Sequence, residues 1–256
     1  MNDALANLGR RSSDVVRYFA ESAQLLARTL VLAVSMRGHG FRVVRRVLTM
    51  QIFFTGAQAV LPVTIASIAV GTLVISQATE YLPGDYVVGV SAVILVREVL
   101  PLLTAFLVIG RSGTAMTIEI GSMRLNDELA ALRMMGIPFE HFVLLPRLVG
   151  MVSAFVLLIT YAYVAALAGG YYVWFAISES AASFPVVDLL EGVDFIDLVW
   201  SVVKVTLFGV VVAVTSVQHG LMVRHSRREL PIYTSRSLVR STLLCAIINT
   251  AVSIIA

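Results

Sequence analysis

Long apolar segments, each able to cross a lipid bilayer, dominate this sequence and leave few possible folds. A transmembrane helix needs about 20 mostly apolar residues. Four segments are clear, and a fifth is shorter and more interrupted by Ser, Thr and Asn: 52–76, 87–110, 142–175, 198–223 and 238–256. The ten-residue alternation typical of membrane β-barrels is absent, so we expect helices. The sequence therefore predicts an all-α integral membrane protein that forms a single domain over residues 1–256.

Arginine is distributed unevenly among the segments that join these spans. Residues 1–51 hold eight Arg, whereas 77–86 and 176–197 hold none. Arginines return in 111–141 and again in 224–237. Basic loops remain on the cytoplasmic side of a membrane, and this alternation fits five spans, with the N-terminus in the cytoplasm and the C-terminus outside. An even number of spans would break the pattern.

Motifs of soluble enzymes and of nucleotide-binding proteins are missing. Only 14% of the residues are charged, against about a quarter in soluble domains. Cys245 is the single cysteine and Lys204 the single lysine, and no GxxxxGK phosphate-binding run exists. The four histidines are scattered, with no HExxH. We therefore expect no enzyme active site, no metal and no cofactor on this chain, so that a partner would have to hydrolyse nucleotide for any driven work.

An amphipathic helix is predicted near the N-terminus, over residues 13–37. Apolar residues recur there at helical spacing, and Arg17, Glu21, Gln24 and Arg28 form the opposite stripe. A helix of this kind, with basic residues on its polar face, is suited to the cytoplasmic membrane interface. The alternative is that it packs on a soluble partner.

A second short amphipathic helix is predicted in the basic segment between spans two and three, over residues 126–136. Asn126 is suited to cap its start, and Gly136 followed by Pro138 would end it. The apolar stripe consists of Leu125, Leu129, Leu132 and Met135. This stripe either packs on the chain's own membrane helices or inserts into another subunit as a coupling helix, and spacing alone does not decide between the two.

Arg97 and Glu98 lie side by side near the centre of the second span. Charged residues cost roughly 2.5–3.5 kcal/mol each at a helix centre, so they normally face protein or water. Neighbours in sequence point about 100° apart on a helix, so the two need different partners. One interpretation is structural: each pairs with a polar group of another helix, for example Glu98 with Lys204.

Residues 97–147, "REVLPLLTAFLVIGRSGTAMTIEIGSMRLNDELAALRMMGIPFEHFVLLPR", resemble the MlaE-type permease family of MCE transport systems. Looser likeness covers the rest of the chain, including "LPVTIASIAVGTLVISQ" in the first span and Lys204 in the fourth. The departures are Leu100, where the family usually has Gly, "LNDEL" in place of VTEQI, and a last cytoplasmic loop, "QHGLMVRHSRRELPIYTSRSLVRS", that is more basic than expected. The matching positions are Arg97, Glu98, Pro101, Leu103, Thr104, Ala105, Gly110, Arg111, Gly113, Glu119, Gly121, Met123, Arg124, Glu128, Ala131, Leu132, Met135, Gly136, Pro146 and Arg147.

This resemblance implies a membrane subunit of an ABC transporter that moves phospholipids or related lipids between bacterial membranes. The implied partners are a second copy of the chain, two ATPase subunits that bind ATP with Mg, a hexamer of MCE-domain proteins and the lipid itself, with no nucleic acid. The implied location is a bacterial inner membrane, with a periplasmic C-terminus. The rival functions are an ion or small-solute channel, or a structural scaffold that holds an ATPase at the membrane.

The resemblance also suggests two groups of site residues. In the first, charged groups would meet a lipid headgroup in a cavity between two protomers and apolar groups would line the path of its acyl chains. These lipid-cavity candidates are Arg97, Glu98, Val70, Val74, Tyr81, Leu95 and Lys204.

The second group would couple the permease to its ATPase. Arg111 and Glu119, at the end of the second span, are either a headgroup anchor and a solvated acid or the two halves of a salt bridge that ties the coupling helix to the span. The ATPase-coupling candidates are Glu128, Leu132, Arg133, Arg111 and Glu119.

Overall fold

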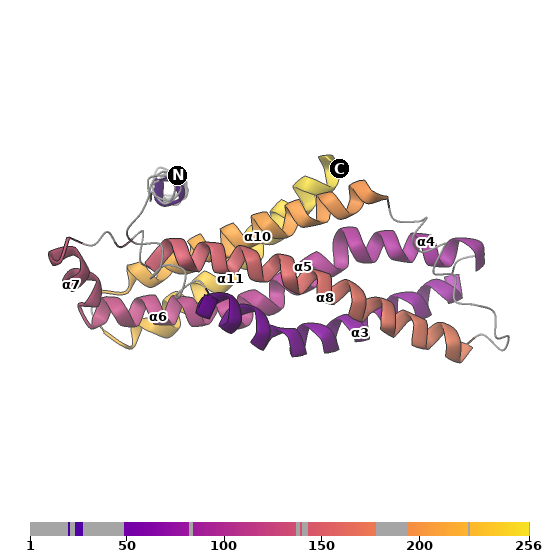
Figure 1. The fold of residues 1–256 in the computed structure, drawn as a ribbon, viewed down its shortest axis with the longest axis horizontal. Coiled ribbons are helices and arrows are strands. Elements are labelled where there is room, and N and C mark those ends of the chain that lie inside the picture. Colours follow the sequence, from indigo (N-terminus) through magenta and orange to yellow (C-terminus); the bar gives the residue numbers. More distant parts are fainter. Residues whose placement is uncertain are drawn as a thin grey trace, which may run out of the picture.

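The protein is an elongated bundle of helices (Figure 1). Among the residues that the computed structural model describes, every regular element is helical and none is a strand, which confirms the all-α prediction. Helix α7 lies at one end of the long axis, and α4 lies toward the other. The described residues are 20, 24–27, 49–81, 84–136, 139, 143–177, 194–224 and 226–255.

The bundle is built from α-helices, with short π-helical segments among them. The α-helices are α3 (Gln58–Tyr81), α4 (Gly84–Ile94), α5 (Leu100–Val108), α6 (Thr114–Leu125), α7 (Glu128–Met134), α8 (Leu145–Ile177), α10 (Phe195–Met222) and α11 (Glu229–Ile255). The π-helices are η1 (Phe53–Ala57), η2 (Leu95–Val99) and η3 (Ile109–Gly113). The segment η1 precedes α3, η2 joins α4 to α5, and η3 joins α5 to α6.

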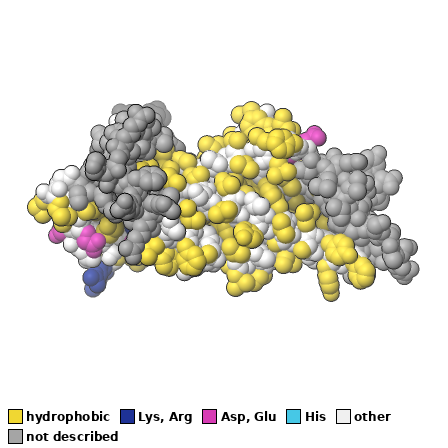
Figure 2. Space-filling view, viewed as in Figure 1, with side chains coloured by type: hydrophobic (Ala, Val, Ile, Leu, Met, Phe, Trp, Pro, Cys, Tyr) yellow, Lys and Arg dark blue, Asp and Glu magenta, His cyan; other side chains and the backbone are white. Residues whose placement is uncertain are grey.

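Five helices of the described residues are long and apolar enough to cross a membrane, as the sequence predicts. Apolar side chains cover much of the face in Figure 2, and the acidic and basic side chains visible there lie toward the ends of the bundle. Such a surface suits a bilayer, whose hydrocarbon core excludes charge. The five spans are Thr49–Ala78, Gly89–Leu125, Leu145–Tyr172, Phe195–Met222 and Glu229–Ile255.

Two of these helices extend by nine or more residues beyond the segments expected from hydropathy, and the first and fourth begin three residues early. The second continues to Leu125, 15 residues past the expected end at 110, because the polar residues from Arg111 onward do not interrupt backbone hydrogen bonding. The fifth begins at Glu229 rather than at 238. Its first turns are polar, but Ser237 and Ser241 are buried against neighbouring helices. Small polar residues at such contacts let helices approach closely in membranes.

Close approach is most evident where α3 packs on α8. A Cβ added at Gly71 of α3 would lie 2.3 Å from the carbonyl oxygen of Ala166. A Cβ at Gly169 of α8 would lie 2.5 Å from the carbonyl oxygen of Ile68. Since real side chains do not tolerate such distances, glycine at these positions sets the spacing of the two helices and hence the place of the first span.

Helix α7 matches the predicted short helix, with one correction at its start. Asn126 does not cap α7; it ends α6, and Asp127 occupies the N-cap with a left-handed backbone (φ 56°) and no side-chain cap bond. The reason is that α6 runs directly into α7 without the loop that the expected cap required. Gly136 ends α7 as predicted, with φ +72° and its N–H bonded to the carbonyl of Arg133.

The predicted interfacial helix over 13–37 lies mostly outside the described residues. Residues 20 and 24–27 are helical, and Leu25 and Leu26 contact the hydrophobic core. The largest fully buried side chains of that core include Phe155, Met151 and Phe208, which come from α8 and α10. These two helices therefore form the centre on which the charged residues of the second span are held.

Candidate functional site

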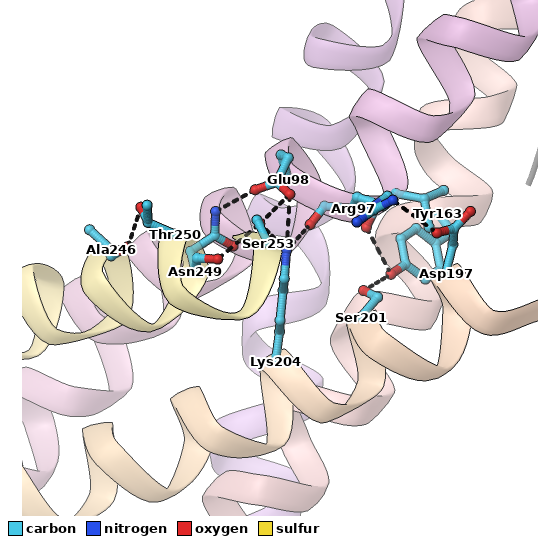
Figure 3. Close-up of polar contacts among 11 residues, drawn as sticks. Arg97, Glu98, Tyr163, Asp197, Ser201, Lys204, Ala246, Asn249, Thr250 and Ser253 are labelled. Carbon is cyan, nitrogen blue, oxygen red and sulfur yellow. Dashed lines mark hydrogen bonds and ion pairs between the residues drawn. The ribbon is translucent and has the colours of Figure 1, made fainter. Parts of the chain in front are cut away.

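Lys204 of α10 lies at the centre of a polar cluster inside the bundle (Figure 3). The residue is 1% exposed. Its ammonium group donates to Glu98 Oε1 at 3.0 Å, to the carbonyl oxygen of Arg97 at 2.7 Å and to Ser253 Oγ at 2.7 Å. An ammonium group has three donors, so this buried cation is fully satisfied by protein. The structure thus contains the Glu98–Lys204 pair that the structural interpretation named.

Glu98 joins this cluster to α11. Its Oε2 accepts a hydrogen bond from Asn249 Nδ2 at 2.6 Å, and its Oε1 also accepts one from the Ser253 hydroxyl. The carboxylate therefore links η2 to both α10 and α11. Its side chain is still 38% exposed, in contrast to Lys204. Glu98 is consequently both held by the bundle and accessible from outside the single chain.

A proline explains why Lys204 reaches the backbone at this point. Pro101 has no N–H, so it gives no hydrogen bond to the carbonyl of Arg97 four residues earlier. Lys204 Nζ supplies the missing donor. Within a bilayer, where water is scarce, a freed carbonyl needs such a partner. The same lysine therefore neutralises Glu98 and donates the hydrogen bond that the helix backbone lacks at Arg97.

The wide π-turn of η2 frees a second carbonyl. The N–H of Leu100 bonds to the carbonyl of Leu95, five residues back, rather than to that of Val96. The Tyr163 hydroxyl of α8 lies 3.5 Å from the Val96 oxygen and also bonds to the Ser201 hydroxyl of α10. Side chains of α8 and α10 thus fix the turn that carries both charges. Short π-segments of this kind are frequent at functional sites.

Arg97 points to a different part of α10 from Glu98, as the 100° rotation between neighbours requires. Its Nη1 lies 3.4 Å from Asp197 Oδ1, and the two side chains are 27% and 11% exposed. Asp197 and Lys204 are seven residues apart, or about two helical turns, so one face of α10 supplies a partner for each charge. The cluster contains two cations, Arg97 and Lys204, and two anions, Asp197 and Glu98, so it has no formal net charge.

The apolar cavity candidates lie in different surroundings. Leu95 is 5% exposed and belongs to the core of the single chain, and Val70 and Val74 are partly buried against that core. Tyr81 ends α3 and is 77% exposed. The structure therefore brings Arg97, Glu98 and Lys204 together in one cluster and leaves the assignment of these four residues to a lipid path as a prediction.

The partners Asn249, Ser253 and Asp197 were not identified from the sequence. Asn249 and Ser253 occupy positions i and i+4 of the last span, so they share one helix face. Two polar residues at this spacing in an apolar helix are a signal that points to a polar partner on another helix. Asp197 falls at the end of the arginine-free segment 176–197, because the sequence predicts that the next span begins at 198, whereas α10 begins at Phe195.

Near the α7 end of the bundle, Arg111 and Glu119 do not pair with each other. Arg111 Nη2 donates to Gln58 Oε1 of α3. Glu119 forms an ion pair with Arg147 of α8, with Oε1 and Nη2 2.5 Å apart. The carboxylate thus ties α6 to α8, and the salt bridge considered between Arg111 and Glu119 is replaced by two separate contacts.

The exposed face of α7 differs from its predicted apolar stripe. Leu129 is buried and Leu132 is partly buried against the chain's own core. Glu128 and Arg133 are exposed, as are Met134 at 84% and Met135 at 65%. Leu129 and Leu132 of the predicted stripe therefore pack on their own chain, whereas Met135 does not. The surface open to another subunit consists of Glu128, Arg133, Met134 and Met135, called the α7 outer face below.

Within the described part of the chain, no group of three or more His, Cys, Asp or Glu side chains is arranged to hold a metal ion. The four charges of the cluster around Lys204 are paired with one another, Arg97 with Asp197 and Glu98 with Lys204.

Comparison with known proteins gives one family. The family described as Permease MlaE has a sequence model that matches residues 48–255. A probable ABC transporter permease protein of Synechocystis is 29% identical over 165 residues, which cover 63% of this chain and 61% of that protein. The intermembrane phospholipid transport system permease protein MlaE of Haemophilus influenzae is 28% identical over 151 residues, covering 56% of this chain and 54% of that protein.

A plant protein is also similar. The chloroplastic protein TRIGALACTOSYLDIACYLGLYCEROL 1 of Arabidopsis thaliana is 23% identical over 153 residues, which cover 60% of this chain and 44% of that protein. The chain matches about three fifths or less of the length of these curated relatives.

Proposed function

This chain belongs to the MlaE permease family, and we propose that it is the membrane subunit of an ABC transporter that moves phospholipids, or related lipids, between the inner and outer bacterial membranes. The observation that carries the proposal is the charged cluster of Arg97, Glu98, Asp197 and Lys204 within the second and fourth spans, displaced from their centres toward the α4 end, satisfied inside the chain yet exposed at Glu98 and Arg97. The name of the Haemophilus relative supports phospholipid as the substrate class.

The exposed parts of the cluster suit a zwitterionic headgroup. Arg97 offers a guanidinium for a phosphate, and Glu98 offers a carboxylate for an ammonium group. In the proposed transporter, two copies of the chain face each other, and the lipid enters the cavity between them with its headgroup at this level. Val70, Val74, Leu95 and Tyr81 would then border the acyl chains.

The links from Glu98 to α10 and α11 suggest how the cavity changes state. A headgroup ammonium would compete with Lys204 and Asn249 for the same carboxylate. Binding would therefore weaken the hydrogen bonds that join η2 to α10 and α11. The lipid would shift the equilibrium between the conformation with these hydrogen bonds and the one without them, by as much as its affinities for the two conformations differ. ATP binding and hydrolysis in the partner would restore them and release the lipid.

Coupling to the ATPase is proposed to use the α7 outer face. The two methionines are flexible and apolar, and Glu128 and Arg133 flank them with both signs of charge. Two ATPase subunits, each with ATP and Mg, would bind there on the cytoplasmic side. A hexamer of MCE-domain proteins would bind at the opposite, periplasmic end and extend the lipid path. The chain itself would carry out no catalysis.

Reconstitution with the ATPase tests the proposal. We expect ATP-dependent transfer of a fluorescent phospholipid out of the proteoliposome, ATPase activity stimulated by lipid, and co-purified phospholipid detectable by mass spectrometry. Glu98→Gln should reduce transfer by at least about tenfold, since it removes one charge-assisted contact. Glu80→Gln, a matched change on an exposed residue at the end of α3, should not.

Other results would support the rival functions instead. Ion flux without ATP would identify a channel. An ATPase that assembles on the chain, but hydrolyses ATP at the same rate with and without lipid and transfers none, would identify a scaffold. The buried stripe of Ser237, Ser241, Cys245 and Asn249 on α11 faces other helices rather than an open pore, which argues against the channel.

A further inference from the structure

A cavity of about 700 Å³ lies between the first span, α6 and the start of α8, toward the α7 end of the bundle. Its lining includes Arg111, Arg147, Glu119 and Glu128, together with apolar side chains such as Phe54 and Met116. This volume is within the range of small-molecule sites, which are mostly apolar with a few polar groups. The cavity is not part of the Glu98 cluster. Arg111 follows Glu98 by thirteen residues on one continuous helix, which separates them by about 20 Å along its axis.

The two arginines of the cavity have spare hydrogen-bonding capacity. Arg111 Nη1 is buried and has no hydrogen-bond partner among the described residues, while Nη2 bonds only to the neutral amide of Gln58. Arg147 is 7% exposed and meets a single carboxylate, that of Glu119. Its terminal nitrogens otherwise contact Met123 Sδ at 3.8 and 3.9 Å, and sulfur is a weak acceptor. A buried guanidinium nitrogen without an acceptor is costly, so the cavity favours an anionic oxygen at Arg111.

The charge and surroundings of the cavity indicate which anion would fit. Its two arginines and two glutamates sum to zero, which disfavours a polyanion such as a nucleotide triphosphate and suits a group that carries both signs. On the side of the first span, Met50 and Phe54 are each 55% exposed, so the cavity is bordered by apolar surface. A phospholipid has a phosphate for Arg111, polar groups for the glutamates and acyl chains for that apolar border.

We propose that this cavity binds the headgroup of a phospholipid from the leaflet at the α7 end of the protein, with its phosphate held by Arg111. This site is separated from the Glu98 cluster by about 20 Å along the helix axis and does not depend on the transport function proposed above. Arg147 also lines the cavity, and although it pairs with Glu119 it adds positive electrostatic potential there for the phosphate.

A photoactivatable phospholipid tests the proposal directly. The full-length chain, without ATPase, is placed in nanodiscs that contain phosphatidylethanolamine with a diazirine near the glycerol backbone, and the labelled peptides are mapped by mass spectrometry. We expect labels within 50–58 or 111–123. Arg111→Gln should reduce them about tenfold, the scale of one lost charge-assisted hydrogen bond. Arg236→Gln is the matched control, since Arg236 is an exposed arginine on α11 that does not line the cavity, and it should leave labelling unchanged.

A second variant leaves every charge in place. Ala115 is exposed and lines the cavity, so Ala115→Phe should fill part of it and reduce labelling at the same peptides even if Arg111→Gln does not fold. Melting temperature and elution volume of each variant show that the fold is retained. Labels in the wild type that persist in both folded variants would overturn the proposal, as would their absence from both peptides.

Two further arms identify the source of the phosphate. Inorganic phosphate and glycerol phosphate at millimolar concentration should not compete with the lipid probe; competition by either would show that the cavity takes a soluble anion, against the proposal. An uncharged diacylglycerol probe with the same diazirine should label at least about tenfold less. Equal labelling by that probe would show an apolar groove without phosphate recognition. No transport is measured, so these outcomes are independent of the reconstitution experiment.

Discussion

The ammonium group of Lys204 lies 2.7 Å from the carbonyl oxygen of Arg97, the carbonyl that Pro101 leaves without a helical donor. The same group lies 3.0 Å from Glu98 Oε1. One side chain of α10 thus compensates both a break in the backbone hydrogen bonds and a charge inside the second span. That charge lies in the first third of the span rather than near its centre as expected, because the helix continues to Leu125. The unpaired carbonyl and the carboxylate both arise from the sequence REVLP. Both are compensated by Lys204, which follows them by more than a hundred residues.

Replacing Lys204 should be among the most damaging single changes. Lys204→Met leaves the Glu98 carboxylate and the Arg97 carbonyl without their cation. Removal of one partner of a fully buried ion pair costs about 3–5 kcal/mol, and the 38% exposure of the Glu98 side chain makes the cost here smaller. We expect a lower melting temperature in detergent. The double variant Lys204→Met with Glu98→Gln should recover part of the loss, because the unpaired charge is gone. A double variant no more stable than Lys204→Met would show that the pair is not the source of the effect.

Asn249 and Thr250 provide a matched comparison on one helix. Asn249 donates to Glu98 Oε2, whereas the Thr250 hydroxyl donates to the carbonyl of Ala246 in its own helix (Figure 3). Interhelical hydrogen bonds in membranes average about 0.6 kcal/mol, with a maximum near 1.7. Asn249→Ala should therefore destabilise the protein by about 1 kcal/mol and change lipid transfer, and Thr250→Ala should do neither. Equal effects in unfolding and transfer assays would contradict a specific role for Asn249.

The packing of α3 on α8 makes Gly71 sensitive to a single methyl group. Gly71→Ala forces the two helices apart, since its Cβ would overlap the Ala166 carbonyl, and overpacking of this kind costs about 1–3 kcal/mol. Gly110→Ala is the control, because a Cβ there has no neighbour within 4 Å. Thermal unfolding of the two variants should differ clearly in midpoint. A Gly71→Ala protein as stable as the control would mean that the helices adjust freely.

Changes on α7 separate its outer face from its inner stripe. Met134→Asp alters a side chain that is 84% exposed, so the chain should keep its own stability while less ATPase co-purifies with it. Leu132→Asp places a charge where Leu132 packs on the core, so it should lower stability as well as ATPase recovery. Stoichiometric ATPase bound to the Met134→Asp variant would exclude the α7 outer face as the contact.

The orientation in the membrane can be tested by labelling introduced cysteines. The native Cys245 is buried, which keeps the background low. Arg133→Cys should react with a membrane-impermeant maleimide only after the inner membrane of spheroplasts is opened, and Glu80→Cys should react in intact spheroplasts. Labelling of both from the same side would contradict the arginine alternation on which the orientation depends.

The number of spans and the helical class could be predicted from the sequence, because a bilayer admits few solutions to the problem of unpaired backbone groups. The pair of Glu98 and Lys204 could also be considered, since the chain has a single lysine and it lies in a span. Asn249 and Ser253 could not be assigned as partners in this way, because many polar residues of α11 face other helices and only the packing shows which of them reach the carboxylate.

Helix boundaries and the directions in which side chains point were harder to predict from the sequence. Hydropathy ends the second span just before Arg111, yet the helix continues through Arg111 to Leu125, because Arg111 and Glu119 find side-chain partners on α3 and α8 without disturbing the backbone. The helix α7 was correctly located along the sequence, but its apolar stripe was only partly right, because Leu125 belongs to α6 and Met135 is exposed. Whether the stripe faces the same chain or another depends on the path of the chain through α6 into α7, which spacing does not describe.

The distance along the chain between Glu98 and its partners has a consequence for biosynthesis. Lys204 and Ser253 follow it by 106 and 155 residues. At 5–20 residues per second, the acid enters the membrane roughly 8–30 s before the serine has been made. Until then it must be protonated, hydrated or shielded by the insertion machinery, so a ribosome that stalls before the last helix would leave a nascent chain whose intramembrane carboxyl group lacks its Asn249 and Ser253 partners.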